Sequence, residues 1–182
     1  MNTEKQLEIE VKIKVQLVEP WRQKIRLLPA ALTRARVFER NVVFDTLQGD
    51  LKKQGMLLRL RQQGAQSVLT MKMPAQENAT YKIREETEVQ VSDFACMEKI
   101  ILAIGFQPNF IYEKYREVFT AWQTHIMIDE TPVGNFIELE GSPESIDAVA
   151  ARLGFSAADY ITDSYHRLFI RSGGRGHMVF QK

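Results

Sequence analysis

The segment LEIEVKIKV, residues 7–15, alternates apolar and charged residues without a break. Because successive side chains of a β-strand point to opposite faces, this pattern predicts a strand with one aliphatic face and one charged face. The charged face carries Glu8, Glu10, Lys12 and Lys14. Carboxylates and ammonium groups gathered on one face raise the question of whether that face meets solvent or a ligand.

The size and charge of the chain limit its classes of function. Its 182 residues fit one domain, and we expect a single domain over 1–182 in which the glycine-rich stretch 171–182 is a mobile tail. The formal net charge of +1 gives no long-range attraction to nucleic acid or to acidic membranes. The single cysteine, Cys96, allows no intramolecular disulfide, and we find no signal peptide and no long apolar run. We therefore expect a cytoplasmic protein with neither a nucleic-acid partner nor a membrane partner.

Period-two segments recur along the chain and predict seven further strands. They are expected at residues 36–45, 56–63, 66–73, 80–91, 110–121, 124–130 and 135–140. Gly64 and Ala65 predict a tight hairpin between the second and third of these segments. Amphipathic helices are expected at 20–28, after Ser142, and after Ser156, where Asp159 completes a variant of the capping box. A further helix is expected from the N-cap Ser92 to Gly105, with Phe94, Met97, Ile101 and Ile104 as its buried stripe.

The charges of these strands come in matched pairs two residues apart. The basic residues are Arg59 and Arg61, Lys72, Lys82 and Arg84, and Lys114 and Arg116; the acidic residues are Glu86 and Glu88, Asp129, and Glu138 and Glu140. For any one strand, a solvated face is the ordinary explanation, because many antiparallel sheets have one wet face. Solvated faces usually mix charge signs, whereas several of these strands keep one sign. If helices cover the aliphatic faces from outside, the charged faces meet inside a closed eight-stranded barrel, which has room for one small ligand.

The charges inside such a barrel indicate which kind of ligand it would bind. Two carboxylates roughly 4 Å apart repel by about 4 kcal/mol at an effective dielectric constant near 20, so clustered acidic residues need protons or a cation. Oxygen ligands without Cys or His suit Mg²⁺ or Mn²⁺. The basic residues carry too much charge to be buried unpaired, and phosphate is the anion that arginine and lysine bind best. A triphosphate with a divalent cation satisfies both sets.

The order of these motifs resembles the CYTH superfamily, named after class IV adenylate cyclase and thiamine triphosphatase and also called the triphosphate tunnel metalloenzymes. The resemblance rests on Glu8-x-Glu10-x-Lys12, Arg59-x-Arg61, Lys72 after "LT", "YKIREE" at 81–86, Lys114-x-Arg116, "MID" ending at Asp129, "FIELEG" at 136–141 and "DSYHRLF" at 163–169. These motifs run through nearly the whole chain in the order found in that superfamily.

The resemblance implies an α+β fold, a closed eight-stranded antiparallel β-barrel with amphipathic helices outside, and chemistry that depends on Mg²⁺ or Mn²⁺. It implies a metal site made by Glu8, Glu10, Glu138 and Glu140, with Asp129 assisting or orienting it. It also implies phosphate binding by Arg59, Arg61, Lys72, Lys82, Arg84, Lys114 and Arg116. Lys12, together with Glu8 and Glu10, would be catalytic, with Lys12 between metal and phosphate. Glu86, Glu88 and the glycine-rich tail receive no role.

The resemblance leaves the reaction open. Chain length, "GNFIELEG" at 134–141 and "SYHRLF" at 164–169 are similar to proteins grouped with class IV adenylate cyclases, which convert ATP to cyclic AMP and pyrophosphate. The alternative is a triphosphatase that hydrolyses inorganic tripolyphosphate or thiamine triphosphate. A third possibility is a non-catalytic binder of nucleotides or polyphosphate. A homodimer is also left open.

Overall fold

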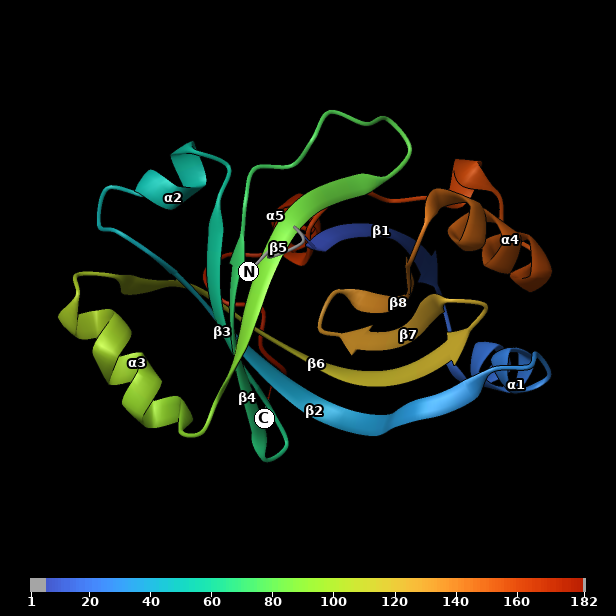
Figure 1. Ribbon diagram of the computed structural model, residues 1–182, viewed down its shortest axis with the longest axis horizontal. Coiled ribbons are helices and arrows are strands. Elements are labelled where there is room, and N and C mark those ends of the chain that lie inside the picture. The colour runs from blue at the N-terminus through green and yellow to red at the C-terminus, as the bar shows by residue number, and fades with distance from the viewer. Residues whose placement is uncertain (1–5, 182) are drawn as a thin grey trace, which may run out of the picture.

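The computed structural model describes residues 6–181, and its centre is a closed barrel of eight antiparallel strands (Figure 1). The strands are β1 (Gln6–Val15), β2 (Ala31–Asp45), β3 (Leu57–Gln63), β4 (Gln66–Lys72), β5 (Lys82–Val91), β6 (Gln107–Ala121), β7 (Thr124–Thr131) and β8 (Gly134–Glu140). Around the barrel they follow the order β1-β5-β4-β3-β2-β6-β7-β8. The predicted fold, an α+β protein built on a closed antiparallel barrel, is confirmed.

Two strands begin earlier than the sequence pattern predicted. Strand β2 begins at Ala31 rather than at residue 36, and β6 begins at Gln107 rather than at residue 110. Their pairing shifts register near Arg34 and again near Pro108. Such irregularities interrupt the alternation of faces, so a search for strict period two misses these strand ends. The predicted hairpin is confirmed, because Gln63 pairs with Gln66 across Gly64, whose φ is +56°.

Helices α1 (Glu19–Arg26) and α4 (Pro143–Leu153) lie together on one side of the barrel (Figure 1). They pack against the aliphatic faces of β1, β7 and β8 in a core that contains Val11, Ile13, Ile126, Ile137 and Leu139 from the strands and Ile25, Ile146 and Val149 from the helices. Burial of this apolar surface is the main stabilising contribution on this side. The expectation that helices cover the barrel from outside is thereby confirmed.

Helix α3 (Phe94–Ala103) covers the opposite side, where Ile101 packs with Phe44 and Leu60. Two details of its prediction were wrong. Asp93, not Ser92, is the N-cap, because its carboxylate accepts a hydrogen bond from the backbone N–H of Cys96 at 2.8 Å. Ile104, expected in the buried stripe, is 66% exposed because the helix ends one residue before it.

The remaining helices are short. Helix α2 (Asp50–Lys53) has four residues, too few for a periodic pattern to reveal it. The capping box of Ser156 and Asp159 is present, but it begins only the single 3₁₀ turn η1 (Ala157–Asp159). Over the described range 6–181, no helix is both long enough and apolar enough to cross a membrane.

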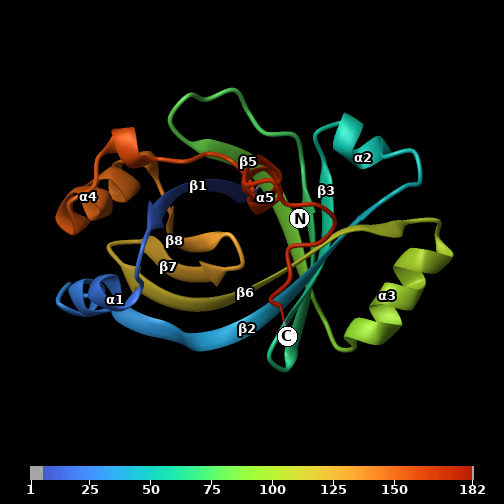
Figure 2. The same ribbon diagram turned by 180° about the vertical axis from the view of Figure 1, so that it is seen from behind.

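The C-terminal segment, from Ile161 through helix α5 (Tyr165–Arg171) to Phe180, follows the barrel wall (Figure 2). The backbone N–H and C=O of Lys12 both hydrogen-bond Ile161, at 2.9 and 2.8 Å. Further on, Met178 forms a parallel bridge with Tyr112 on β6 and is fully buried. The part of the C-terminal stretch around Met178 thus supplies a partner to the edge of β6 that β7 leaves free.

Candidate active site inside the barrel

The barrel encloses a cavity of about 710 Å³. All the predicted site residues except Asp129 line it, namely Glu8, Glu10, Lys12, Arg59, Arg61, Lys72, Lys82, Arg84, Lys114, Arg116, Glu138 and Glu140. Lys14, which follows Lys12 on the same strand face, is exposed and does not line this cavity. Because side chains alternate along each strand, the charged faces all point into one interior space, as the residue pattern predicted.

Strands β1 and β8 bring carboxylates together on one wall. Their register pairs Glu10 with Glu140 and Lys12 with Glu138. The ammonium group of Lys12 lies 2.7 Å from Glu10 Oε1 and 3.2 Å from Glu138 Oε2, and Lys82 also donates a hydrogen bond to Glu10. The ammonium group of Lys12 therefore lies between a carboxylate of β1 and a carboxylate of β8.

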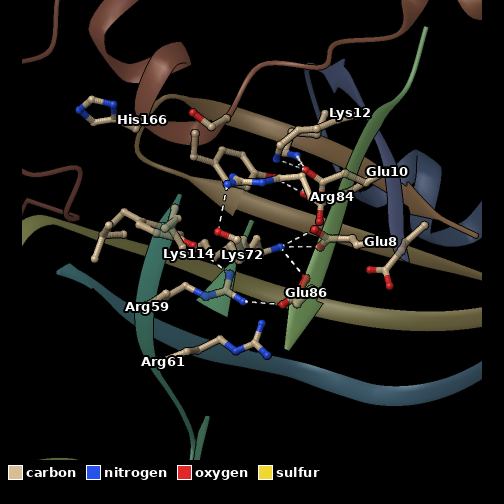
Figure 3. A pocket seen from close by; sticks show the side chains of 18 of the residues that line it. Glu8, Glu10, Lys12, Arg59, Arg61, Lys72, Arg84, Glu86, Lys114 and His166 are labelled. Carbon is tan, nitrogen blue, oxygen red and sulfur yellow. Dashed lines mark hydrogen bonds and ion pairs between the residues drawn. The ribbon is translucent and has the colours of Figure 1, made fainter. Parts of the chain in front are cut away.

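Lys72 on β4 joins two other carboxylates, as Figure 3 shows. Its Nζ lies 2.6 Å from Glu8 Oε1 and 2.8 Å from Glu86 Oε2. Arg59 and Arg61 point into the same space from β3 (Figure 3). Sequence analysis assigned no role to Glu86, and in the structure this residue is part of the cavity wall.

Glu88 also has partners, which the sequence did not reveal. The Thr70 hydroxyl donates a hydrogen bond to Glu88 Oε1 at 2.6 Å, and the Nη2 atoms of Arg59 and Arg61 each lie 3.4 Å from the same oxygen. Strand β4 lies between β3 and β5 in the barrel, so residues that are distant in sequence meet here.

Asp129 lies behind the cavity wall and is fully buried. Its Oδ1 accepts a hydrogen bond from Arg116 Nε at 2.6 Å, and its Oδ2 accepts hydrogen bonds from Lys114 at 2.9 Å and from the Tyr165 hydroxyl at 2.6 Å. Both oxygens are thus occupied by protein donors. This arrangement favours the orienting role that the resemblance implied for Asp129 over direct metal binding.

Two carboxyl groups in the cavity have raised pKa values. Burial, together with the charges of Glu8, Glu138 and Glu10, raises the pKa of Glu140 to about 7. Burial likewise raises the pKa of Glu86 to about 7, although Lys72 opposes the rise. Burial acts in the same direction on Glu10, but Lys12, Lys82 and Lys72 outweigh it and hold the pKa of Glu10 well below its usual range.

The donor chemistry of the cavity suits a divalent cation. Among residues 6–181, no three Asp, Glu, His or Cys side chains stand as a ready-made metal cluster, because ammonium and guanidinium groups bind most of the carboxylates. The Glu140 carboxylate has neither a hydrogen bond nor an ion pair in the part of the chain that the structure describes, and three other glutamates raise its pKa. Glu8, Glu10, Glu138 and Glu140 could hold Mg²⁺ or Mn²⁺ after their side chains turn away from the lysines.

Sequence reasoning missed several polar residues of the interior. Glu39 and Asn41 are fully buried on β2, and Tyr112 accepts a hydrogen bond from Arg59 Nη1 at 3.3 Å. The spacing of these residues is a signal that could have identified them. Tyr112 lies two residues before the predicted inward residue Lys114, and Glu39 and Asn41 lie two residues apart on one strand face. Tyr165 lies in the motif "DSYHRLF" at 163–169, but no strand periodicity marks it as an inward residue, because it belongs to a helix.

One end of the cavity has a different lining. Here α5 contributes His166 and β6 contributes Asn109 and Phe110. The rings of Phe110 and His166 meet edge to face with centroids 4.6 Å apart. Aromatic and amide groups at this end offer contacts to a planar organic group that the charged middle of the cavity does not.

Comparisons with known proteins agree with this geometry. A protein of Methanocaldococcus jannaschii, named provisionally as an adenylate cyclase, is 26% identical over 142 residues, which are 78% of this chain and 80% of that protein. A structure from Vibrio parahaemolyticus with the same provisional description is 19% identical and has a TM-score of 0.82, covering 92% of this chain and 99% of that one.

A third structure, from Hippeastrum, is described as a provisional adenylyl cyclase with a dominant triphosphatase activity. It is 18% identical with a TM-score of 0.68, and the match covers 92% of this chain and 97% of that one. At these identities, the two structures show a shared fold. The family model of the CYTH domain matches residues 6–165, which include all eight strands and the first residue of α5. This chain therefore belongs to the CYTH domain family.

Proposed function

We propose that this chain is a divalent-metal-dependent enzyme that cleaves a triphosphate inside the barrel, with conversion of ATP to cyclic AMP and pyrophosphate as the first candidate reaction. The observation that carries the proposal is the cavity in which Glu10, Glu138 and Glu140 on β1 and β8 face the same space as Arg59 and Arg61 on β3. Basic residues alone would serve to bind an anion. The carboxylates weaken anion binding unless a cation accompanies the anion, so they favour an enzyme over a non-catalytic binder.

The residues of the chain divide the work by chemistry. Arg59, Arg61, Lys114 and Arg116 would hold the non-bridging phosphate oxygens and offset the charge that develops on the transferring group. A bound Mg²⁺ or Mn²⁺ would polarise the phosphoryl group and orient the reactants. Lys12 stands between Glu10 and Glu138, which raise its pKa although burial opposes them, so it stays protonated and positively charged beside both groups of ligands.

For the cyclase reaction, the 3′-oxygen of ribose attacks the α-phosphorus and pyrophosphate leaves. This reaction needs a place for the nucleoside beside the phosphate site, and the end of the cavity at Asn109, Phe110 and His166 supplies suitable groups. The provisional names of the relatives from Methanocaldococcus and Vibrio also support this reaction.

A triphosphatase is the second candidate. In this reaction a water oriented by the metal attacks the terminal phosphorus, and Glu140, which lines the cavity, would help to hold the cation that orients this water. The dominant triphosphatase activity described for the Hippeastrum protein supports the same alternative. The substrate would be inorganic tripolyphosphate or thiamine triphosphate.

Product analysis tests the proposal. The purified protein would receive ATP, tripolyphosphate or thiamine triphosphate with Mg²⁺ or Mn²⁺, and chromatography would resolve cyclic AMP, ADP, pyrophosphate and phosphate. Cyclic AMP with pyrophosphate supports the cyclase, whereas phosphate without cyclic AMP supports the triphosphatase. Absence of turnover with every substrate, together with unchanged tripolyphosphate affinity in Glu138→Ala, would leave a binder and refute the enzyme.

A further inference from the structure

The first residue of α5 sends its side chain into the end of the barrel. Tyr165 is 6% exposed, and its ring packs edge to face against Phe136 with centroids 5.5 Å apart. The Nζ atom of Lys12 lies 5.3 Å from the centroid of the Tyr165 ring, and the Nζ atom of Lys114 lies 5.1 Å from it. At these distances, the ring face attracts both ammonium groups.

The hydroxyl of Tyr165 reaches the acidic residues beside those lysines. It donates a hydrogen bond to Asp129 Oδ2 at 2.6 Å and lies 3.4 Å from Glu138 Oε2. Asp129 in turn binds Lys114 and Arg116. One side chain therefore contacts two lysines through its ring and two carboxylates through its hydroxyl.

The backbone fixes Tyr165 relative to the site. Four residues before it, Ile161 is hydrogen-bonded to both backbone groups of Lys12. Immediately before it, the Ser164 hydroxyl caps α5 by accepting a hydrogen bond from the N–H of Arg167 at 3.2 Å. The same segment thus anchors to the residue that the Tyr165 ring contacts.

We propose that Tyr165 is a positioning residue that sets the arrangement of Lys12, Lys114 and Asp129 for a metal-bound triphosphate. The inference rests on the proposed function and assigns Tyr165 no contact with the substrate. A residue that only fills the end of the barrel needs no hydroxyl, whereas this hydroxyl is buried and directed at a carboxylate that holds two phosphate-site cations. Removing such a supporting hydrogen bond typically costs about 10-fold to about 100-fold in metal affinity or activity.

The experiment compares Tyr165→Phe with Tyr160→Phe. Tyr160 is a matched control, because its hydroxyl donates a 2.8 Å hydrogen bond to Asp147. Neither Tyr160 nor Asp147 lines the cavity. Each variant therefore loses one Tyr–Asp hydrogen bond. Measurements are the melting temperature, Mn²⁺ affinity by calorimetry in the presence of tripolyphosphate, and the separate values of kcat and KM.

We expect Tyr165→Phe to lower Mn²⁺ affinity or kcat by about 10-fold or more, and Tyr160→Phe to leave both within about twofold. Equal values for the two variants would overturn the inference while leaving the proposed function intact. A wild-type protein that neither binds Mn²⁺ nor turns over a triphosphate would overturn the proposed function and, with it, this inference.

A second measurement separates positioning from packing. If Tyr165 acts through Asp129, then adding Tyr165→Phe to Asp129→Asn should cost less in kcat than adding it to the wild type. Costs that simply multiply would contradict action through Asp129. This comparison also remains informative if Tyr165→Phe reduces stability, because the same change at Tyr165 separates the two members of each pair.

Discussion

At the centre of β1, both faces are buried to a similar extent but have opposite chemistry. On the outer face, Val11 and Ile13 are 0% and 1% exposed under α1 and α4, and on the inner face Glu10 and Lys12 are 4% and 2% exposed. Outer burial removes apolar surface from water and stabilises the fold. Inner burial removes charges from water, and this desolvation costs free energy that can exceed the stabilisation from the ion pairs. Burial alone therefore does not distinguish core from site, and changes on the two faces should affect different measurements.

The largest expected effect is on the inner wall at Glu140. Glu140→Gln should lower metal-dependent turnover by about 100-fold to about 1000-fold, because it removes a charged ligand from the cation site. Its stability without metal should rise at pH 8, because the wild-type carboxylate is ionised there among three other glutamates. Steady-state kinetics and urea unfolding of the same preparation check both parts. Unchanged turnover would remove Glu140 from the metal site.

On the outer face of the same strand, Ile13→Ala should have the reverse profile. Truncation of a fully buried aliphatic side chain costs about 2–5 kcal/mol of unfolding free energy, because it loses hydrophobic burial and leaves a cavity. The fraction that stays folded should keep its KM. Urea unfolding gives the stability, and kinetics at low temperature give KM. A changed KM with unchanged stability would contradict the separation of the faces.

Lys12 and Lys14 sharpen the comparison along one face. Lys12→Met should reduce kcat/KM by about 100-fold, because the charge between Glu10 and Glu138 is lost. Lys14→Met should change it less than about twofold, since Lys14 is exposed and outside the cavity. The two variants are matched in residue type, strand and direction. Equal losses would mean that the active part of the face extends past Lys12.

The smallest expected effect is a pH dependence of stability. A carboxyl group whose folded pKa is raised favours the folded state while it is protonated, so its contribution declines as pH rises from its unfolded value, near 4.5, through about 7. For Glu140 and Glu86, we expect metal-free stability to fall by about 1–3 kcal/mol between pH 5 and pH 8. Glu10 and Glu138 have lowered pKa values, so their contributions are lost only below about pH 4.5.

Urea unfolding in a chelator at several pH values measures this slope. Glu140→Gln should flatten it, and Glu98→Gln, a change at a half-buried position of α3 outside the cavity, should not. A slope of the wild-type size in Glu140→Gln would assign the effect to other groups.

Much of the barrel follows from local sequence, and the reason is physical. Alternation along LEIEVKIKV determines that Glu8, Glu10 and Lys12 share a face, and the same holds for the paired charges of β3, β6 and β8. The order in which strands pair in the barrel does not follow from the local sequence. The contact of Lys72 with Glu8 and Glu86 requires the order β1-β5-β4, which no single segment encodes.

The parts of the site that the sequence did not predict lie where regular periodicity ends. Tyr165 is in a helix of seven residues, and its role depends on the pairing of Ile161 with Lys12 at the other end of the chain. Asp129 has the expected inward direction, yet its neighbours Lys114 and Arg116 cover it. The alternation of residues predicts which side chains point into the barrel, whereas the packing of the folded chain determines which of them reach the cavity.

The pairing of Lys12 with Ile161 has a consequence for the order of events during translation. A ribosome that has produced β8 has already made every glutamate and basic residue that we assign to the metal and phosphate sites, but it has not yet made Tyr165. The barrel can close as soon as β8 is free to pair with β1, while its end stays uncovered until α5 emerges. A chain whose synthesis stops before Ile161 would thus contain all these residues but lack the segment that positions Lys12. The ability to turn over substrate would therefore appear only late in synthesis.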